Sequence, residues 1–167
     1  MELNVAKALK QAGQPFSFSL EETLGPLSYG GRVIELAAPL SVSGAYAFDG
    51  KGFSLQARGN TVLCCKCARC GEPFQQAYAF PVNERFTKTS DPNEDEMYPY
   101  TGERLDLDQA VMDNFYLHLP VASFCKEDCK GLCPVCGVNC NQYACACGEG
   151  SAAGRFSALS ALTHEEE

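Results

Sequence analysis

The sequence contains no tryptophan, no long uncharged apolar run, and fewer basic than acidic residues. A membrane-spanning helix needs about 20 consecutive, predominantly apolar residues, and no uncharged stretch of this chain offers nearly that many. The first residues include Glu2, Lys7 and Lys10, where a secretory signal would have an uninterrupted apolar core. We therefore expect a cytoplasmic protein that does not contact membranes.

Positive charge is also scarce. The chain has 13 Lys and Arg against 21 Asp and Glu, a net charge of -8. This is the wrong sign for a protein that binds nucleic acid mainly by neutralising phosphates. The sequence leaves direct RNA contact open, and such contact would be confined to a local group of basic residues around a predicted hairpin: Arg58, Lys66, Arg69, Arg85 and Lys88.

Residue patterns typical of catalysis are absent as well. We find no nucleophile paired with a general base and no glycine-rich loop that would cradle a phosphate. The carboxylates of Asp106 and Asp108 fall at the start of a predicted helix, where the helix dipole accounts for them. His118, near the end of that helix, is interpreted as a packing residue. We expect no enzymatic activity and no small-molecule substrate.

Apolar and polar residues alternate through much of the first half of the chain. With 167 residues, 46% of them hydrophobic, the chain is long enough to bury a core. The alternation predicts short strands paired as antiparallel hairpins. The segment Asp49-Gly50-Lys51-Gly52 supplies a tight turn, because glycine accepts the positive φ that such turns need. The expected strands cover residues 16–20, 33–36, 42–48, 53–57, 60–67 and 78–86.

One main helix is predicted over about residues 106–118. Asp106 and Gln109 have the spacing of a capping box, and the helix should end before Pro120. Residues 88–102 follow neither the helical nor the strand period, which predicts a loop. The residues on the inward face of the helix are Leu107, Ala110, Val111, Asn114 and Phe115.

Together these patterns predict an α+β fold. It would consist of β-rich antiparallel hairpins, arranged like a barrel or as a sandwich, with one main helix and a Cys-rich C-terminal zinc-binding stretch. Residues 1–120 would form the core. Residues 121–150 would form a metal-binding segment packed on the Cys-x-x-Cys turn at 67–70, and we call such a turn a cysteine knuckle. Residues 151–167 would form a tail with a short helical turn.

Cysteine is the residue type in excess. There are 11, and a reducing cytoplasm disfavours disulfides, which leaves metal binding or redox chemistry. Two Cys-x-x-Cys-Gly units, beginning at Cys67 and Cys133, each let two sulfurs bind one ion at about 2.3 Å. With four further cysteines, the spacing predicts two structural zinc sites of four thiolates each. The eight ligands are Cys67, Cys70, Cys125, Cys129, Cys133, Cys136, Cys145 and Cys147.

The pairing of these ligands is open at the level of sequence. In the local arrangement one ion is shared by Cys133, Cys136, Cys145 and Cys147, and the other by Cys67, Cys70, Cys125 and Cys129. The alternative joins the two knuckles on one ion and leaves Cys125, Cys129, Cys145 and Cys147 for the other. In both, all-sulfur coordination leaves no position for water or substrate, so the sites are structural. The remaining cysteines are interpreted as small core or surface residues: Cys64, Cys65 and Cys140.

Several motifs in this chain are typical of one bacterial family. They are Cys67-Ala68-Arg69-Cys70-Gly71-Glu72-Pro73-Phe74, Val82-Asn83-Glu84-Arg85-Phe86, Leu117-His118-Leu119-Pro120, Cys129-Lys130-Gly131-Leu132-Cys133-Pro134-Val135-Cys136-Gly137, Asn139, Asn141 and Arg155-Phe156. With them the chain resembles the large ribosomal RNA subunit accumulation protein family. The resemblance implies a small cytosolic protein, shared by bacteria and plastids, that is needed for accumulation or processing of 23S ribosomal RNA and has no assigned catalytic activity.

The leading hypothesis is therefore a non-enzymatic ribosome-biogenesis factor that presents a surface to a ribosomal protein or a large-subunit assembly intermediate. The acidity of the chain suits a basic partner. Two hypotheses from other classes follow from the cysteines. One is a redox or electron-transfer protein, either rubredoxin-like or a thiol sensor, and the other is a zinc-ribbon module of the transcription apparatus. The sequence does not predict the oligomeric state.

Overall fold

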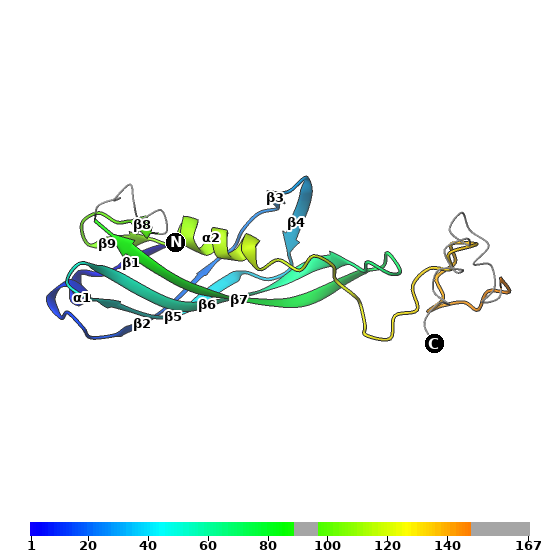
Figure 1. Cartoon of the computed structure of the whole chain (residues 1–167), viewed down its shortest axis with the longest axis horizontal. Helices are drawn as coiled ribbons and strands as arrows, with labels where there is room; N and C mark the ends of the chain where they lie inside the picture. The colour runs from blue at the N-terminus through cyan, green and yellow to red at the C-terminus, as the bar shows by residue number, and fades with distance from the viewer. Residues whose placement is uncertain (89–96, 148–167) are drawn as a thin grey trace, which may run out of the picture. The chain divides into compact units, whose positions relative to one another are not determined.

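The computed structural model describes residues 1–88 and 97–147. The chain divides into two compact units (Figure 1). The first consists of Met1–Cys65 and Pro73–Ser123. The described residues of the second are 66–72 and 124–147. The predicted tail at 151–167 lies outside the described residues.

A mostly antiparallel sheet forms the first unit and confirms the predicted fold class. β2 pairs with β5, β5 and β4 pair with β6, and β3 pairs with β4, all antiparallel. β7 pairs with the central strand β6. Among the described residues these strands make an open, sandwich-like sheet and no closed barrel. The strands are β2 (Phe16–Glu22), β3 (Leu27–Tyr29), β4 (Arg32–Leu36), β5 (Leu40–Phe48), β6 (Gly52–Lys66), β7 (Pro73–Thr87) and β8 (Met97–Pro99).

β6 is one long strand where the sequence predicts two short ones. The predicted strands at 53–57 and 60–67 leave Arg58 and Gly59 between them. In the structure the ring of Phe80 fills the space beside Gly59, and a Cβ there would lie 2.2 Å from that ring. The glycine therefore lets the neighbouring strand approach closely and does not end the strand.

The predicted loop at 88–102 is partly wrong. Within it, β8 pairs with Arg85–Thr87 of β7 in parallel. The ring of Tyr98 lies 5.6 Å from that of Phe86, and the Tyr98 hydroxyl donates to a carboxylate oxygen of Asp113 at 2.9 Å. These contacts, which come from residues distant in sequence, hold a strand that local periodicity does not indicate. The rest of the predicted loop, residues 89–96, lies outside the described residues.

The predicted main helix corresponds to α2 (Asp108–Leu117), and all five residues of its predicted inward face are buried. The capping box is wrong. Leu107 precedes the helix without a side-chain cap, and Asp106 Oδ1 instead accepts the N–H of Asp108 at 3.0 Å. His118 is exposed at the helix end, where its Nδ1 lies 2.9 Å from the carbonyl O of Asn114. The packing role predicted for His118 is therefore wrong.

Three short elements complete the first unit. β1 (Glu2–Asn4) pairs antiparallel with β9 (Arg104–Asp106), and α1 (Ala6–Lys10) follows β1 directly. A five-residue helix is too short to show a full amphipathic pattern, and the sequence did not indicate it. No helix among the described residues is long and apolar enough to cross a membrane.

Aromatic side chains fix α2 on the sheet. Phe115 meets the rings of Tyr78 and Phe80 on β7 edge to face, at 5.3 and 5.6 Å between centroids. The Tyr78 hydroxyl also donates to the carbonyl O of Phe115 at 2.6 Å. Edge-to-face pairs of this kind contribute stability beyond the area they bury. The helix is thus held by ring packing and by a hydrogen bond to its backbone.

The turn between β5 and β6 is held by the side chain of Asp49. Its carboxylate accepts the backbone N–H groups of Lys51 and Gly52 at 2.9 and 2.8 Å and pairs with Arg85 at 2.6 Å. Gly50 has a φ of 94°, as the turn prediction requires. The N–H bonds, with that of Gly52 contributing most, lower the pKa of Asp49. A carboxyl with a lowered folded pKa stabilises the fold above its unfolded pKa of about 3.9, and this contribution disappears as pH falls through the folded pKa.

We expect Asp49→Ala to lower the free energy of unfolding by roughly 0.5–1 kcal/mol near neutral pH. The value is small because the Asp49 side chain is 45% exposed and its ion pair is screened by solvent. In urea titrations, the difference between the wild type and this variant should narrow below about pH 4. Asp49→Asn keeps an oxygen acceptor, so its free energy of unfolding should lie between those of the wild type and Asp49→Ala. A difference that stays constant into strong acid would contradict this account of the turn.

Candidate metal centre

The first cysteine knuckle connects β6 to β7 and belongs to the second unit. Cys67 N–H donates to the carbonyl O of Glu72 at 2.9 Å, and Gly71 N–H donates to the carbonyl O of Cys67 at 2.9 Å. Gly71 has a φ of 75°, which side chains with a Cβ rarely adopt. The chain therefore reverses within a few residues and brings the sulfurs of Cys67 and Cys70 together.

The second knuckle repeats these contacts. Cys133 N–H donates to the carbonyl O of Val138 at 2.8 Å, and Gly137 N–H donates to the carbonyl O of Cys133 at 2.9 Å. Gly137 has a φ of 73°. The local sequence Cys-x-x-Cys-Gly thus folds into the same turn twice, because it provides the same donors, acceptors and glycine at the same spacing.

Eight cysteines gather in two groups of four. Within each group all Sγ atoms lie within 4.8 Å of one another. We call Cys67, Cys70, Cys125 and Cys129 the first cluster, and Cys133, Cys136, Cys145 and Cys147 the second cluster. The structure thus has the local arrangement of the two that the sequence left open. All 11 cysteines are free thiols, and Cys64, Cys65 and Cys140 lie outside both clusters.

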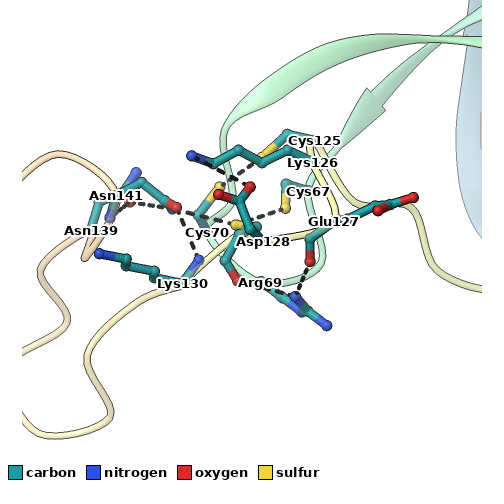
Figure 2. Close-up of polar contacts among 11 residues, drawn as sticks. Cys67, Arg69, Cys70, Cys125, Lys126, Glu127, Asp128, Lys130, Asn139 and Asn141 are labelled. Carbon is teal, nitrogen blue, oxygen red and sulfur yellow. Dashed lines mark hydrogen bonds and ion pairs between the residues drawn. The ribbon is translucent and has the colours of Figure 1, made fainter.

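The sulfur spacing fits a shared metal ion. In the first cluster, Sγ of Cys67 lies 3.7 Å from Sγ of Cys129, and Sγ of Cys70 lies 3.8 Å from Sγ of Cys125 (Figure 2). Four sulfurs at about 2.3 Å from one tetrahedral zinc would be about 3.8 Å apart. A disulfide would bring two sulfurs to about 2.05 Å. Each cluster could therefore hold one metal ion, and in the first these two sulfur separations already match a tetrahedral site.

Burial and charge differ among the thiols. In the first cluster Cys67, Cys70 and Cys129 are buried, whereas in the second Cys136 and Cys147 are exposed. The backbone N–H of Cys125 contributes most to lowering the pKa of Cys67 to about 6, and burial raises the pKa of Cys125 to about 12. Four neighbouring thiolates would repel one another, so some sulfurs keep their protons. A divalent cation removes this repulsion and favours ionisation of all four.

The second cluster shows the same division. Backbone N–H groups, that of Cys136 foremost, lower the pKa of Cys133 to about 6. At Cys147, the hydrogen bond between its side chain and that of Cys136 contributes most to raising the pKa to about 12. Backbone N–H groups therefore favour the thiolate form of the first cysteine of each knuckle. At Cys133 they belong to the knuckle itself, whereas at Cys67 the largest contribution comes from Cys125 on the later segment.

Arg69 holds the segment that carries Cys125 and Cys129 against the first knuckle. Its Nη1 donates to the carbonyl oxygens of Glu127 and Cys129 at 3.0 and 3.1 Å (Figure 2). Its guanidinium lies over the ring of Phe124, 4.7 Å from the ring centroid. From the sequence, Arg69 was assigned only to a group of basic residues available for RNA contact, because its position between Cys67 and Cys70 does not indicate which residues it contacts across the turn.

A group of hydrogen-bonded amides lies beside the first cluster, and one of them contacts a sulfur. Asn141 Nδ2 donates to Sγ of Cys129 at 3.3 Å and to Asn139 Oδ1 at 2.8 Å. Asn139 Nδ2 and Gln142 Nε2 both lie 3.3 Å from Glu72 Oε1. The two asparagines flank Cys140 in the sequence, and this position within the Cys-rich segment is the one sequence feature that could have indicated a role near the cysteines. Their partners depend on the folded turn and could not be deduced.

Arg69 provides a test of this arrangement. We expect Arg69→Ala to weaken metal binding at the first cluster about tenfold, in the range for residues that orient metal ligands. Arg69→Lys keeps the charge and loses the planar fork, so it should recover only part of the affinity. Competition with a chelator measures the affinity. Lys126→Ala removes only an exposed ion pair with Asp128, so it should leave the metal affinity of the first cluster unchanged. An unchanged affinity in Arg69→Ala would show that this side chain does not position the ligands.

A β-rich sheet combined with two four-cysteine clusters defines the class of protein. A family model described as large ribosomal RNA subunit accumulation protein YceD matches residues 54–163, a region that includes both clusters. The chain belongs to this family, which confirms the resemblance inferred from the motifs. The family description names the accumulation of an RNA and no reaction.

Individual relatives match shorter regions. An uncharacterized protein of Mycobacterium tuberculosis is 36% identical over 81 residues, which cover 44% of this chain and 38% of that protein. The large ribosomal RNA subunit accumulation protein YCED homolog 1, chloroplastic, of Arabidopsis thaliana is 31% identical over 51 residues, covering 30% of this chain and 16% of that protein. The chain thus spans about two fifths of the length of the mycobacterial relative. No solved structure matches the chain.

Proposed function

We propose that this protein is a non-enzymatic, zinc-binding ribosome-biogenesis factor of the cytoplasm that supports accumulation or processing of 23S ribosomal RNA. The observation that carries the proposal is the family match over residues 54–163. Relatives from Arabidopsis thaliana and Zea mays have the same description in their names. Because that description names no reaction, an assembly role accounts for it more directly than catalysis.

Zinc is the metal that best suits the two clusters. Thiolates are soft ligands, and four sulfurs in a tetrahedron are typical of zinc or of iron in sulfur-rich sites. A site closed by four protein ligands has no open position for substrate, so its contribution is structural. The first cluster joins the β6–β7 connection to residues 125–129. Zinc there would therefore tie together segments that are distant in the sequence.

The proposed partner is a basic ribosomal protein or an assembly intermediate that contains one. The chain has a net charge of -8 before any thiolate is counted, and thiolate clusters carrying one divalent ion each add further negative charge. Charge of this sign accelerates encounter with basic proteins and disfavours naked RNA. We therefore expect the protein to bind a basic protein in preference to RNA.

Depletion of the protein tests the proposed role. We expect cells depleted of it to show a lower ratio of mature large-subunit to small-subunit ribosomal RNA, with the wild-type gene restoring the ratio. RNA blots measure mature and precursor species together, which separates failed processing from degradation. A ratio that stays normal after complete depletion would overturn the proposal.

The exposure of the second cluster favours one alternative, a thiol sensor. Cys136 and Cys147 are exposed, and accessible thiolates are the ones that oxidants attack. Such a sensor would release metal from the second cluster under mild peroxide and change its partner binding as a result. Metal content that is unchanged by peroxide would exclude this alternative.

A further inference from the structure

The two clusters share one short stretch of backbone. Cys129 belongs to the first cluster and Cys133 to the second. Between them, Leu132 N–H donates to the carbonyl O of Arg69, in the first knuckle, at 3.1 Å. A Cβ on Gly131 would lie 3.1 Å from the same oxygen, so the two segments are in close contact. The backbone that enters the second knuckle is therefore anchored on the first.

The loop of the second cluster returns to this same stretch. Leu132 forms an antiparallel bridge with Asn139, and Cys140 N–H donates to the carbonyl O of Gly131 at 2.9 Å. Both contacts come from the segment between Cys136 and Cys145, which are ligands of the second cluster. A metal ion in the second cluster would fix both ends of this segment.

Asn141 makes the most direct link between the clusters. It lies in the loop closed by the second cluster, yet its Nδ2 donates to Sγ of Cys129 in the first at 3.3 Å (Figure 2). Lys130 N–H donates to Asn141 Oδ1 at 2.9 Å, and this bond orients the amide so that its NH2 group faces the sulfur. A donor to a thiolate stabilises its negative charge and fixes its direction toward a metal.

We propose that Asn141 is a positioning residue that couples the two clusters, so that metal bound by the second cluster raises the affinity of the first. With the loop closed at both ends, Asn141 is already held beside Cys129. Without metal in the second cluster, the cost of ordering the loop falls on binding at the first. By linkage, metal in the first cluster raises the affinity of the second by the same factor. The inference rests on the proposed metal binding at both clusters.

The test is a Co²⁺ titration of the full chain under reducing conditions, followed by the thiolate-to-cobalt absorption and by competition with a chelator. The double substitution Cys145→Ser, Cys147→Ser disables the second cluster and should weaken Co²⁺ binding at the first about 10- to 100-fold. Asn141→Ala should weaken the first cluster in the same range in the otherwise intact chain. In the chain with a disabled second cluster, Asn141→Ala should cause little further loss of Co²⁺ affinity at the first cluster.

Two further variants separate positioning from packing. Asn141→Asp has the same shape but replaces the donor beside Cys129 with an acceptor, so it should weaken the first cluster at least as much as Asn141→Ala and shift its charge-transfer band. Cys140→Ser, next to Asn141, keeps the backbone bond to Gly131 and should leave the affinity unchanged.

Equal effects of Asn141→Ala in both backgrounds would overturn the coupling, as would an unchanged first cluster after loss of the second. In either case metal binding, and with it the proposed function, would stand. Absence of thiolate-to-cobalt absorption in the wild type would overturn the metal-binding proposal itself, so the two failures are distinguishable.

Discussion

Cys133→Ser is expected to remove the zinc of the second cluster and leave the chain with the zinc of the first. Cys133 is the buried member of its cluster, and its N–H and carbonyl form the turn of the knuckle. A serine hydroxyl does not replace a thiolate ligand under ordinary conditions, and a structural zinc contributes on the order of 10 kcal/mol to folding of its segment. Cys67→Ser should remove the zinc of the first cluster in the same way. Elemental analysis combined with native mass spectrometry counts the ions.

Cys64→Ser and Cys140→Ser are the matched controls, because both thiols lie outside the clusters. Each should retain one zinc for each four-cysteine cluster. Backbone amide exchange should increase in residues 133–147 for Cys133→Ser and stay unchanged for the controls. A loss of zinc in a control, or full zinc content in Cys133→Ser, would contradict the ligand sets assigned from the sulfur positions.

Phe115→Ala is expected to destabilise the first unit by about 3–5 kcal/mol, the range for truncating a buried phenylalanine. Phe115 is fully buried, and its ring meets Tyr78 and Phe80. Truncation leaves a cavity between α2 and β7 and removes both ring contacts. Urea denaturation monitored by far-ultraviolet circular dichroism measures the change in the free energy of unfolding.

Leu117→Ala is the control on the same helix. Leu117 is 77% exposed, so its truncation should change the free energy of unfolding by no more than about 0.5 kcal/mol. This control substitution changes helix propensity little, because leucine and alanine are both strong helix formers. Equal destabilisation by the two variants would show that α2 does not pack on the sheet as described.

The sequence predicts features that depend on local chemistry. Apolar patterning identified β2, β4, β5, β6 and β7, although it divided β6 in two, and helical spacing identified the buried face of α2. The knuckles could be predicted because Cys-x-x-Cys-Gly provides its own turn: Gly71 and Gly137 take the positive φ, and the cysteines provide the donors and acceptors. In each of these cases neighbouring residues determine the outcome.

Features that depend on distant residues could not be predicted. β8 exists because Tyr98 packs on Phe86, and β6 continues through Gly59 because a ring from β7 fills the space. The pairing of the cysteines depends on contacts of the same kind, such as the bonds from Arg69 to the segment that carries Cys129. Spacing alone allowed two ligand arrangements, since both satisfy a tetrahedral ion equally well.

The proposed function requires the zinc-bound first cluster for accumulation of large-subunit ribosomal RNA. The most direct test is to express Cys67→Ser, Cys70→Ser in cells depleted of the protein and to measure the ratio of large-subunit to small-subunit ribosomal RNA. Cys64→Ser, Cys140→Ser, with the same number of replaced thiols, is the control. We predict that the control restores the ratio and the cluster variant, at equal protein level, does not. Full restoration by a cluster variant that has lost its zinc would contradict the account.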